Sequence, residues 1–80
     1  MKAFNQYRHE VDLHGLRHKE VEDKVWRELL YAQDYDCFPV KFVTGNSKRM
    51  KQIVLDTVGG AGYITLHQIF PTSGFVLVQE

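Results

Sequence analysis

Apolar and polar residues alternate over residues 8–13, which is the pattern of a β-strand with one buried face. Val11 and Leu13 fall on one face of this strand, and Asp12 and His14 fall on the other. A half-buried strand covers a core with its apolar face and leaves its polar face in water. The first predicted element therefore carries a carboxylate and an imidazole on its exposed side.

Two longer segments repeat their apolar residues at the spacing of an α-helix. Residues 18–33 place apolar side chains four residues apart, at Val21, Val25 and Leu29. The next helical stripe comprises Met50, Ile53, Val54, Thr57 and Val58. Ser47 stands where the N-cap of that second helix is expected. The turn-rich residues 34–39 and the pair Gly59-Gly60 are expected to end the two helices.

Three further segments have the composition of strands. Residues 40–43 are apolar and β-branched, and residues 62–70 and 75–79 are joined by a turn at 71–74. Short links between strand, helix and strand favour a right-handed parallel crossover. The sequence therefore predicts one domain over residues 1–80, of the α/β class. We expect an α+β two-layer sandwich in the order βαβαββ, with two helices on one face of a mixed four-stranded sheet.

Size and charge narrow the classes of function. The 80 residues include ten basic and ten acidic side chains, so the formal net charge is zero. A neutral chain is a poor match for a protein that coats nucleic acid by bulk charge. One cysteine excludes an internal disulfide, and we find neither a membrane-spanning apolar run nor a secretory signal. We therefore expect a cytoplasmic protein without a membrane partner.

Basic residues cluster shortly after two glycines in the sequence. Arg17, His18 and Lys19 follow Gly15, and Lys48, Arg49 and Lys51 follow Gly45. Ligands of open α/β sheets bind beyond the carboxyl ends of the strands, where both of these stretches would lie. If the two strands are neighbours, the stretches share one rim. A solvated helix face explains either cluster alone, and the repeated placement is what favours an anion site.

The segment Thr44 to Ser47 offers a device for binding phosphate. Gly45 can adopt backbone angles that other residues avoid, and the amides that follow it would lie at a helix N-terminus, where the helix dipole is positive. The predicted phosphate-binding residues are Thr44, Gly45, Asn46, Ser47, Lys48, Arg49 and Arg17. The alternative interpretation is that Ser47 only caps the helix and Gly45 only forms a turn.

Asp12 and His14 are the candidate catalytic residues. Imidazole titrates near neutral pH, which suits proton transfer. Asp12 would orient the imidazole, act as a base, or hold a divalent cation such as Mg²⁺ together with water and phosphate oxygens. Alternatively, both side chains only cap the adjacent helix or bond a loop. The other histidines do not have metal-ligand spacing, so no permanently bound metal is expected.

These motifs resemble those of the Smr (small MutS-related) domain family. The segments VDLHGL, VTGNSKRMKQIV and SGFVLV are similar to short stand-alone members, whose hallmarks are L-D-L-H-G and T-G-x-G. Val11 replaces the first leucine, and Ser47 stands where the second glycine is usual. The resemblance implies a fold similar to the C-terminal domain of bacterial translation initiation factor three. It assigns the D-L-H residues to Asp12, Leu13 and His14, and the T-G residues to Thr44 and Gly45.

The resemblance also implies a function on nucleic acid, because family members are endonucleases that cleave RNA or nick DNA, or proteins that mainly bind. We therefore expect an endonuclease, more readily on RNA, with Asp12 and His14 as its catalytic residues. A non-catalytic nucleic-acid-binding module and a protein–protein adaptor are the alternatives. Substrate choice would come from the surface of this chain or from a separate protein partner that supplies targeting.

Overall fold

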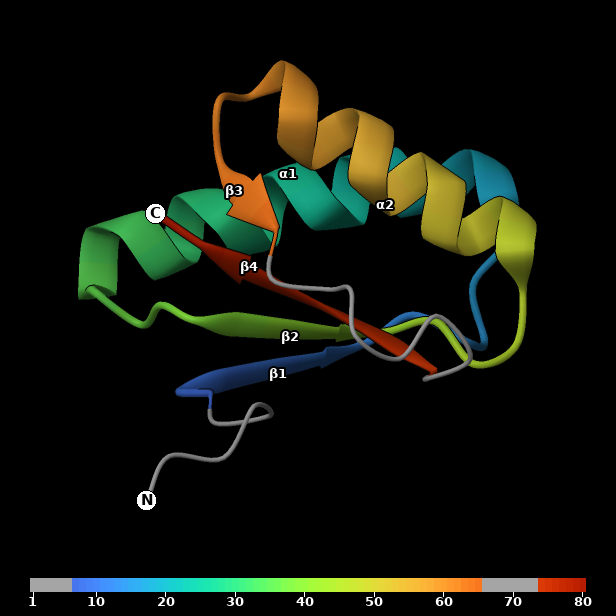
Figure 1. Ribbon diagram of the computed structural model, residues 1–80, viewed down its shortest axis with the longest axis horizontal. Coiled ribbons are helices and arrows are strands. Elements are labelled where there is room, and N and C mark those ends of the chain that lie inside the picture. The colour runs from blue at the N-terminus through green and yellow to red at the C-terminus, as the bar shows by residue number, and fades with distance from the viewer. Residues whose placement is uncertain (1–6, 66–73) are drawn as a thin grey trace.

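The structure, a computed structural model, describes residues 7–65 and 74–80. Its elements are β1 (His9–Asp12), α1 (His18–Tyr35), β2 (Val40–Val43), α2 (Lys48–Gly60), β3 (Ile64–Thr65) and β4 (Phe75–Gln79), as Figure 1 shows. The predicted order βαβαββ is therefore confirmed, as are the two helices and the mixed four-stranded sheet. Of the strand predicted over 62–70 and the turn over 71–74, residues 66–73 lie outside the described residues.

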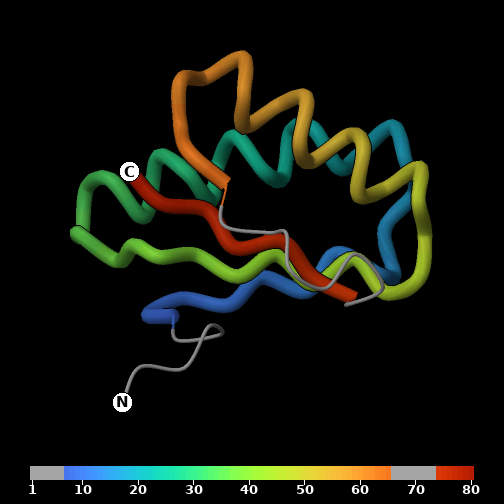
Figure 2. Tube along the Cα trace, in the orientation of Figure 1, coloured from blue at the N-terminus to red at the C-terminus, as the bar shows by residue number. Residues whose placement is uncertain are grey.

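The sheet has the strand order β1-β2-β4-β3. β1 and β2 are adjacent and parallel, as the short links around α1 predicted. β4 is antiparallel to both of its neighbours, β2 and β3. Figure 2 follows the chain from β1 and β2, which run side by side, to β4 on the other side of β2. The last strand in the sequence thus lies inside the sheet.

The core fills the space between the helices and one face of the sheet. Both helices lie on the same side of the sheet (Figure 1). Val11, Phe42 and Val76 are in register across β1, β2 and β4, and all three are buried. The helices complete the cluster with the predicted stripes, Val21, Val25, Leu29, Met50, Val54 and Val58. Burying each of these side chains contributes about 1.5–3 kcal/mol, so this face holds the fold together.

Both helices end later than predicted. α1 includes Tyr35, because the left-handed residue that stops it is Asp36, with φ 55° and its N–H bonded to the carbonyl of Ala32. α2 runs through both glycines at 59 and 60, which were predicted to end it. Glycine tolerates helical angles, and the left-handed position falls on Gly62 instead, with φ 88°.

The end of α2 is a Schellman motif. The N–H of Tyr63 bonds to the carbonyl of Val58, and the N–H of Gly62 bonds to that of Gly59, both at 3.1 Å. This pairing needs a left-handed residue one position before Tyr63, which is why the helix continues until Gly62 is reached. In residues 7–65 and 74–80, neither helix combines the length and apolar character that crossing a bilayer requires.

Candidate active site at the carboxyl ends of β1 and β2

The two predicted stretches meet at one rim of the molecule. β1 and β2 end side by side, and the N–H of Leu13 extends their pairing by donating to the carbonyl of Val43 at 2.8 Å. α1 and α2 both begin at this end (Figure 1). A Cβ atom on Gly45 would lie 3.6 Å from the Cβ of His14, so the two loops are in contact. The expectation that the strands share a rim is confirmed.

Asp12 and His14 form a hydrogen-bonded pair at this rim. Oδ1 of Asp12 accepts the backbone N–H of His14 at 3.1 Å and lies 2.6 Å from its ring Nδ1. The side chains of Asp12 and His14 are 60% and 65% exposed. The side-chain hydrogen bond from His14, followed by the backbone one, lowers the pKa of Asp12, so this carboxyl is ionised at neutral pH.

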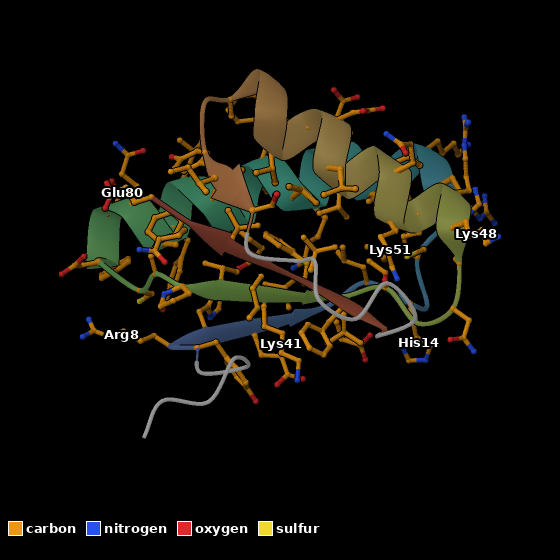
Figure 3. The ribbon with its side chains drawn as sticks, in the orientation of Figure 1. Arg8, His14, Lys41, Lys48, Lys51 and Glu80 are labelled. Atoms are coloured by element: carbon orange, nitrogen blue, oxygen red, sulfur yellow. The ribbon has the colours of Figure 1, made fainter. Side chains whose placement is uncertain are left out.

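The charge state of Asp12 determines which ring nitrogen of His14 is available. An ionised carboxylate only accepts hydrogen bonds, so Nδ1 of His14 carries the proton that it shares with Asp12. In the neutral ring, the lone pair is then on Nε2. Within the described part of the chain, Nε2 has no hydrogen-bond partner. Figure 3 shows His14 at the end of the molecule where α2 begins, close to solvent. The pair thus fixes the orientation of the His14 ring and leaves Nε2 accessible.

A backbone contact with the last strand fixes the Thr44–Gly45 loop. The carbonyl of Gly74 accepts the N–H groups of Thr44 at 2.8 Å and Gly45 at 3.0 Å. Gly45 has φ 66°, the left-handed angle that was predicted to require glycine. A Cβ atom on Gly74 would lie only 3.3 Å from the Cα of Gly45, so Gly74 allows the close approach. Sequence reasoning missed this role and saw Gly74 only as part of a turn.

The side chain of Thr44, a predicted phosphate-binding residue, lies within the loop. It is buried, and its hydroxyl donates to the carbonyl of Gly45 at 3.2 Å. In this structure the hydroxyl is therefore bonded within the loop and not exposed. Thr44 acts on the site by holding the loop, while Asn46, the next residue but one, is exposed.

The start of α2 is the better of the two anion sites. Ser47 is its N-cap, as predicted, and its Oγ accepts the N–H of Met50 at 3.0 Å. The N–H of Lys51 makes the first backbone bond of the helix, to the carbonyl of Ser47 at 3.1 Å. The amides of Lys48 and Arg49 come before that bond and have no acceptor among the described residues. Two amides, two exposed cationic side chains and the helix dipole coincide here.

The start of α1 is less suited to an anion. Arg17 is its N-cap, and its backbone N–H donates to Oε1 of Glu20 at 3.1 Å. This carboxylate adds a negative charge to the first turn of α1, whereas the first turn of α2 contains no acidic residue. The Arg17 side chain is exposed, so it is available to support a ligand held mainly by α2.

Charged side chains of both signs lie at each end of the molecule. Figure 3 places Lys48 at the rim, and Arg8 and Glu80 at the opposite end. The carboxylate of Asp12 also lies at the rim. The feature that distinguishes the start of α2 is therefore its first turn, which has basic residues and no acidic one.

The carboxylates of the described residues do not form a metal centre. No three histidine, cysteine, aspartate or glutamate side chains gather within residues 7–65 and 74–80 in a way that would hold a metal ion. Asp12 would supply a single carboxylate oxygen to Mg²⁺, and the other ligands would be water and phosphate oxygens.

Comparison with known proteins adds no further assignment to these residues. No family model, no curated protein and no solved structure matches the chain.

Proposed function

We propose that this protein is an endonuclease of the Smr type that cleaves RNA at the rim formed by β1, β2 and α2. The observation that carries the proposal is the exposed Asp12–His14 pair, joined at 2.6 Å and in contact with the loop that leads into α2. A base and an anion-binding helix terminus side by side are the two parts that phosphodiester cleavage requires. The sequence motifs shared with the Smr family support the same function.

Different residues bind the phosphate and transfer the proton. The amides and side chains of Lys48 and Arg49 hold the phosphate and balance its charge. Nε2 of His14 takes the proton from the attacking hydroxyl, and Asp12 fixes the orientation of the ring through Nδ1. When Mg²⁺ is bound, it would add positive charge beside Asp12 and the phosphate.

A single imidazole paired with a single carboxylate suits RNA in particular. The ribose 2′-hydroxyl is already adjacent to the phosphate, so one imidazole suffices: Nε2 of His14 takes the proton of this hydroxyl, and the imidazolium so formed, or water, gives a proton to the departing 5′-oxygen. Its attack forms a bond to phosphorus as the bond to the 5′-oxygen breaks, leaving a 2′,3′-cyclic phosphate and a 5′-hydroxyl. Attack by water would instead leave a phosphate monoester, so mapping the product ends identifies the nucleophile.

The proposal is tested by the turnover of His14→Ala. Loss of a positioned general base lowers the rate by roughly 10²–10⁴-fold. The melting temperature should not change, because the His14 side chain is 65% exposed. His18→Ala is the matched control, since His18 is an exposed histidine at the start of α1. If purified His14→Ala cleaves a structured RNA as fast as the parent protein does, the proposal is wrong.

A binding module without catalysis is the second candidate. The observation in its favour is the high exposure of Asp12 and His14, because water around a site weakens the electrostatic effects that assist catalysis. This candidate predicts salt-dependent binding of RNA and no turnover, with or without Mg²⁺. The turnover of the parent protein separates the two.

A further inference from the structure

The sheet has a second face, opposite to the helices, and its side chains include both charge and aromatic rings. β1 directs Asp12 to this face, because Val11 before it points into the core. The register across the sheet pairs Asp12 with Val43, and Val43 with Phe75. The three residues form one row that starts at the candidate catalytic pair and ends at a phenylalanine.

A lysine lies between two rings next to this row. Nζ of Lys41 lies 4.7 Å from the centre of the Phe75 ring and 4.8 Å from that of Tyr7. The Tyr7 side chain is exposed, and Phe75 is half-buried. Leu77, the next residue of β4 on this face, is buried. Tyr7 comes before β1, at the end of the strand away from Asp12, and its ring meets this face at Lys41. The Phe75 ring therefore adjoins the candidate site, and Lys41 links it to the Tyr7 ring.

The spacing of the row matches the size of a nucleotide. Neighbouring strands lie about 4.8 Å apart, so Asp12 and Phe75, two strands apart, are separated by roughly 10 Å. A nucleotide whose phosphate lies at the rim extends its base over a distance of that order. The Phe75 ring is thus within reach of a base attached to the phosphate that His14 would act on.

We propose that Phe75 and Tyr7 form a stacking surface for an unpaired base, and that the ligand of this protein is therefore a single strand. Lys41 would contribute its charge to the phosphate of the neighbouring nucleotide. Single strands are recognised by aromatic rings beside basic side chains, whereas base faces inside a duplex are already stacked and inaccessible. This inference rests on the proposed function, because it takes the phosphate position from the candidate site.

The experiment compares two backbones of equal charge. One probe is a fluorescently labelled pentamer of 2′-O-methyluridine, which cannot be cleaved by 2′-hydroxyl attack, and the other is the same pentamer without its bases. Stacking of one base contributes at least about 1 kcal/mol, which corresponds to about fivefold in affinity. We expect the parent protein to bind the base-bearing pentamer at least about fivefold more tightly in fluorescence anisotropy.

Substitutions test which residues of this sheet face cause the preference for the base-bearing pentamer. Phe75→Leu keeps an apolar side chain and removes the ring. The ratio of the affinities for the base-bearing and the base-free pentamer should therefore fall toward one. Tyr7→Leu, at an exposed residue, is the second variant in case Phe75→Leu does not fold. Tyr35→Leu, at an exposed residue at the end of α1, should retain the full preference.

Equal affinity of the parent protein for both pentamers would overturn the stacking surface, as would an undiminished preference in folded Phe75→Leu and Tyr7→Leu. A duplex bound more tightly than the pentamer would also overturn it. In each of these cases, turnover that depends on His14 would leave the proposed function intact. If neither single strands nor duplexes bind, both proposals are wrong.

Discussion

Two imidazole–carboxylate pairs in this protein have the same separation and different surroundings. Asp12–His14 and His9–Glu28 are each 2.6 Å apart. The side chains of His9 and Glu28 are only 25% and 19% exposed, and they join β1 to α1. The ring of His9 also packs 5.0 Å from that of Tyr31. The short distance alone therefore does not distinguish the two pairs, whereas the exposure of their side chains does.

The largest expected effect comes from removing the charge of the exposed pair. Asp12→Asn keeps the size of the side chain but no longer holds the Nδ1 proton of His14 by charge, so turnover should fall by roughly 10²-fold or more. RNA affinity should hold or increase, because a negative charge beside the phosphate is lost. Rate and affinity are measured on the same preparation. Unchanged turnover would show that Asp12 does not position His14.

The corresponding change in the less exposed pair should affect stability instead. Burial raises the pKa of Glu28, but hydrogen bonds from His9 and Lys24 outweigh it, and the net pKa lies below the ordinary 4.5. Glu28→Gln should lower the free energy of unfolding at neutral pH by about 1–2 kcal/mol, since bonds to a charged group are lost. Turnover measured well below the melting temperature should be unchanged.

The pH dependence of this effect has a definite sign. A carboxyl with a lowered pKa in the folded state contributes its full stabilisation above its unfolded pKa and loses it as the pH falls through the folded value. The difference in stability between the parent protein and Glu28→Gln should therefore shrink in acid, as the pH falls below the ordinary 4.5. Denaturant titrations across this range measure it. A difference that grows in acid would contradict the assignment.

The two glycine loops of the rim should respond differently to alanine. Gly45 has φ 66°, so Gly45→Ala should cost about 1–2 kcal/mol of stability. At Gly15, a Cβ atom would meet nothing within 4 Å and no left-handed angle is required, so Gly15→Ala should stay within about 0.5 kcal/mol of the parent protein. Thermal unfolding of both variants provides the measurement. Equal losses would mean that backbone strain is not what distinguishes the loops.

The smallest effect is expected in the salt dependence of binding. Each phosphate contact contributes about 0.7 to the slope of log affinity against log salt for a single strand. Lys48→Ala combined with Arg49→Ala should therefore flatten the slope by about 1.4, without changing base preference. Arg27→Ala, at an exposed residue in the middle of α1, is the control and should leave the slope unchanged. An unaltered slope in the double variant would place the phosphate elsewhere.

Local patterns predicted the parts of the site that depend on a few neighbouring residues. Alternation in residues 8–13 predicted that Asp12 and His14 share the exposed side, and Ser47 was recognised as a cap from its position. Each of these features is set by the period of one element or by the geometry of one helix end. The apolar stripes identified the core for the same reason.

The sequence did not predict contacts between segments that are distant along the chain. Gly74 accepts hydrogen bonds from residues near position 45, and His9 bonds Glu28 across 19 residues. These contacts depend on strand order and on how α1 lies over β1. The spacing of apolar residues within one segment does not predict either of these. The burial of Thr44 was missed for a related reason, because it continues the core face of β2 beyond the strand.

The position of β4 inside the sheet has a consequence for the order in which the site is assembled during synthesis. A ribosome adds residues 9–60 before it reaches residue 74, at about 5–20 residues per second. Until then, β2 lacks one neighbour and the carbonyl that holds the Thr44–Gly45 loop has not been made. The loop that joins β2 to α2 is therefore fastened at its start only once residue 74 and the strand after it have been added.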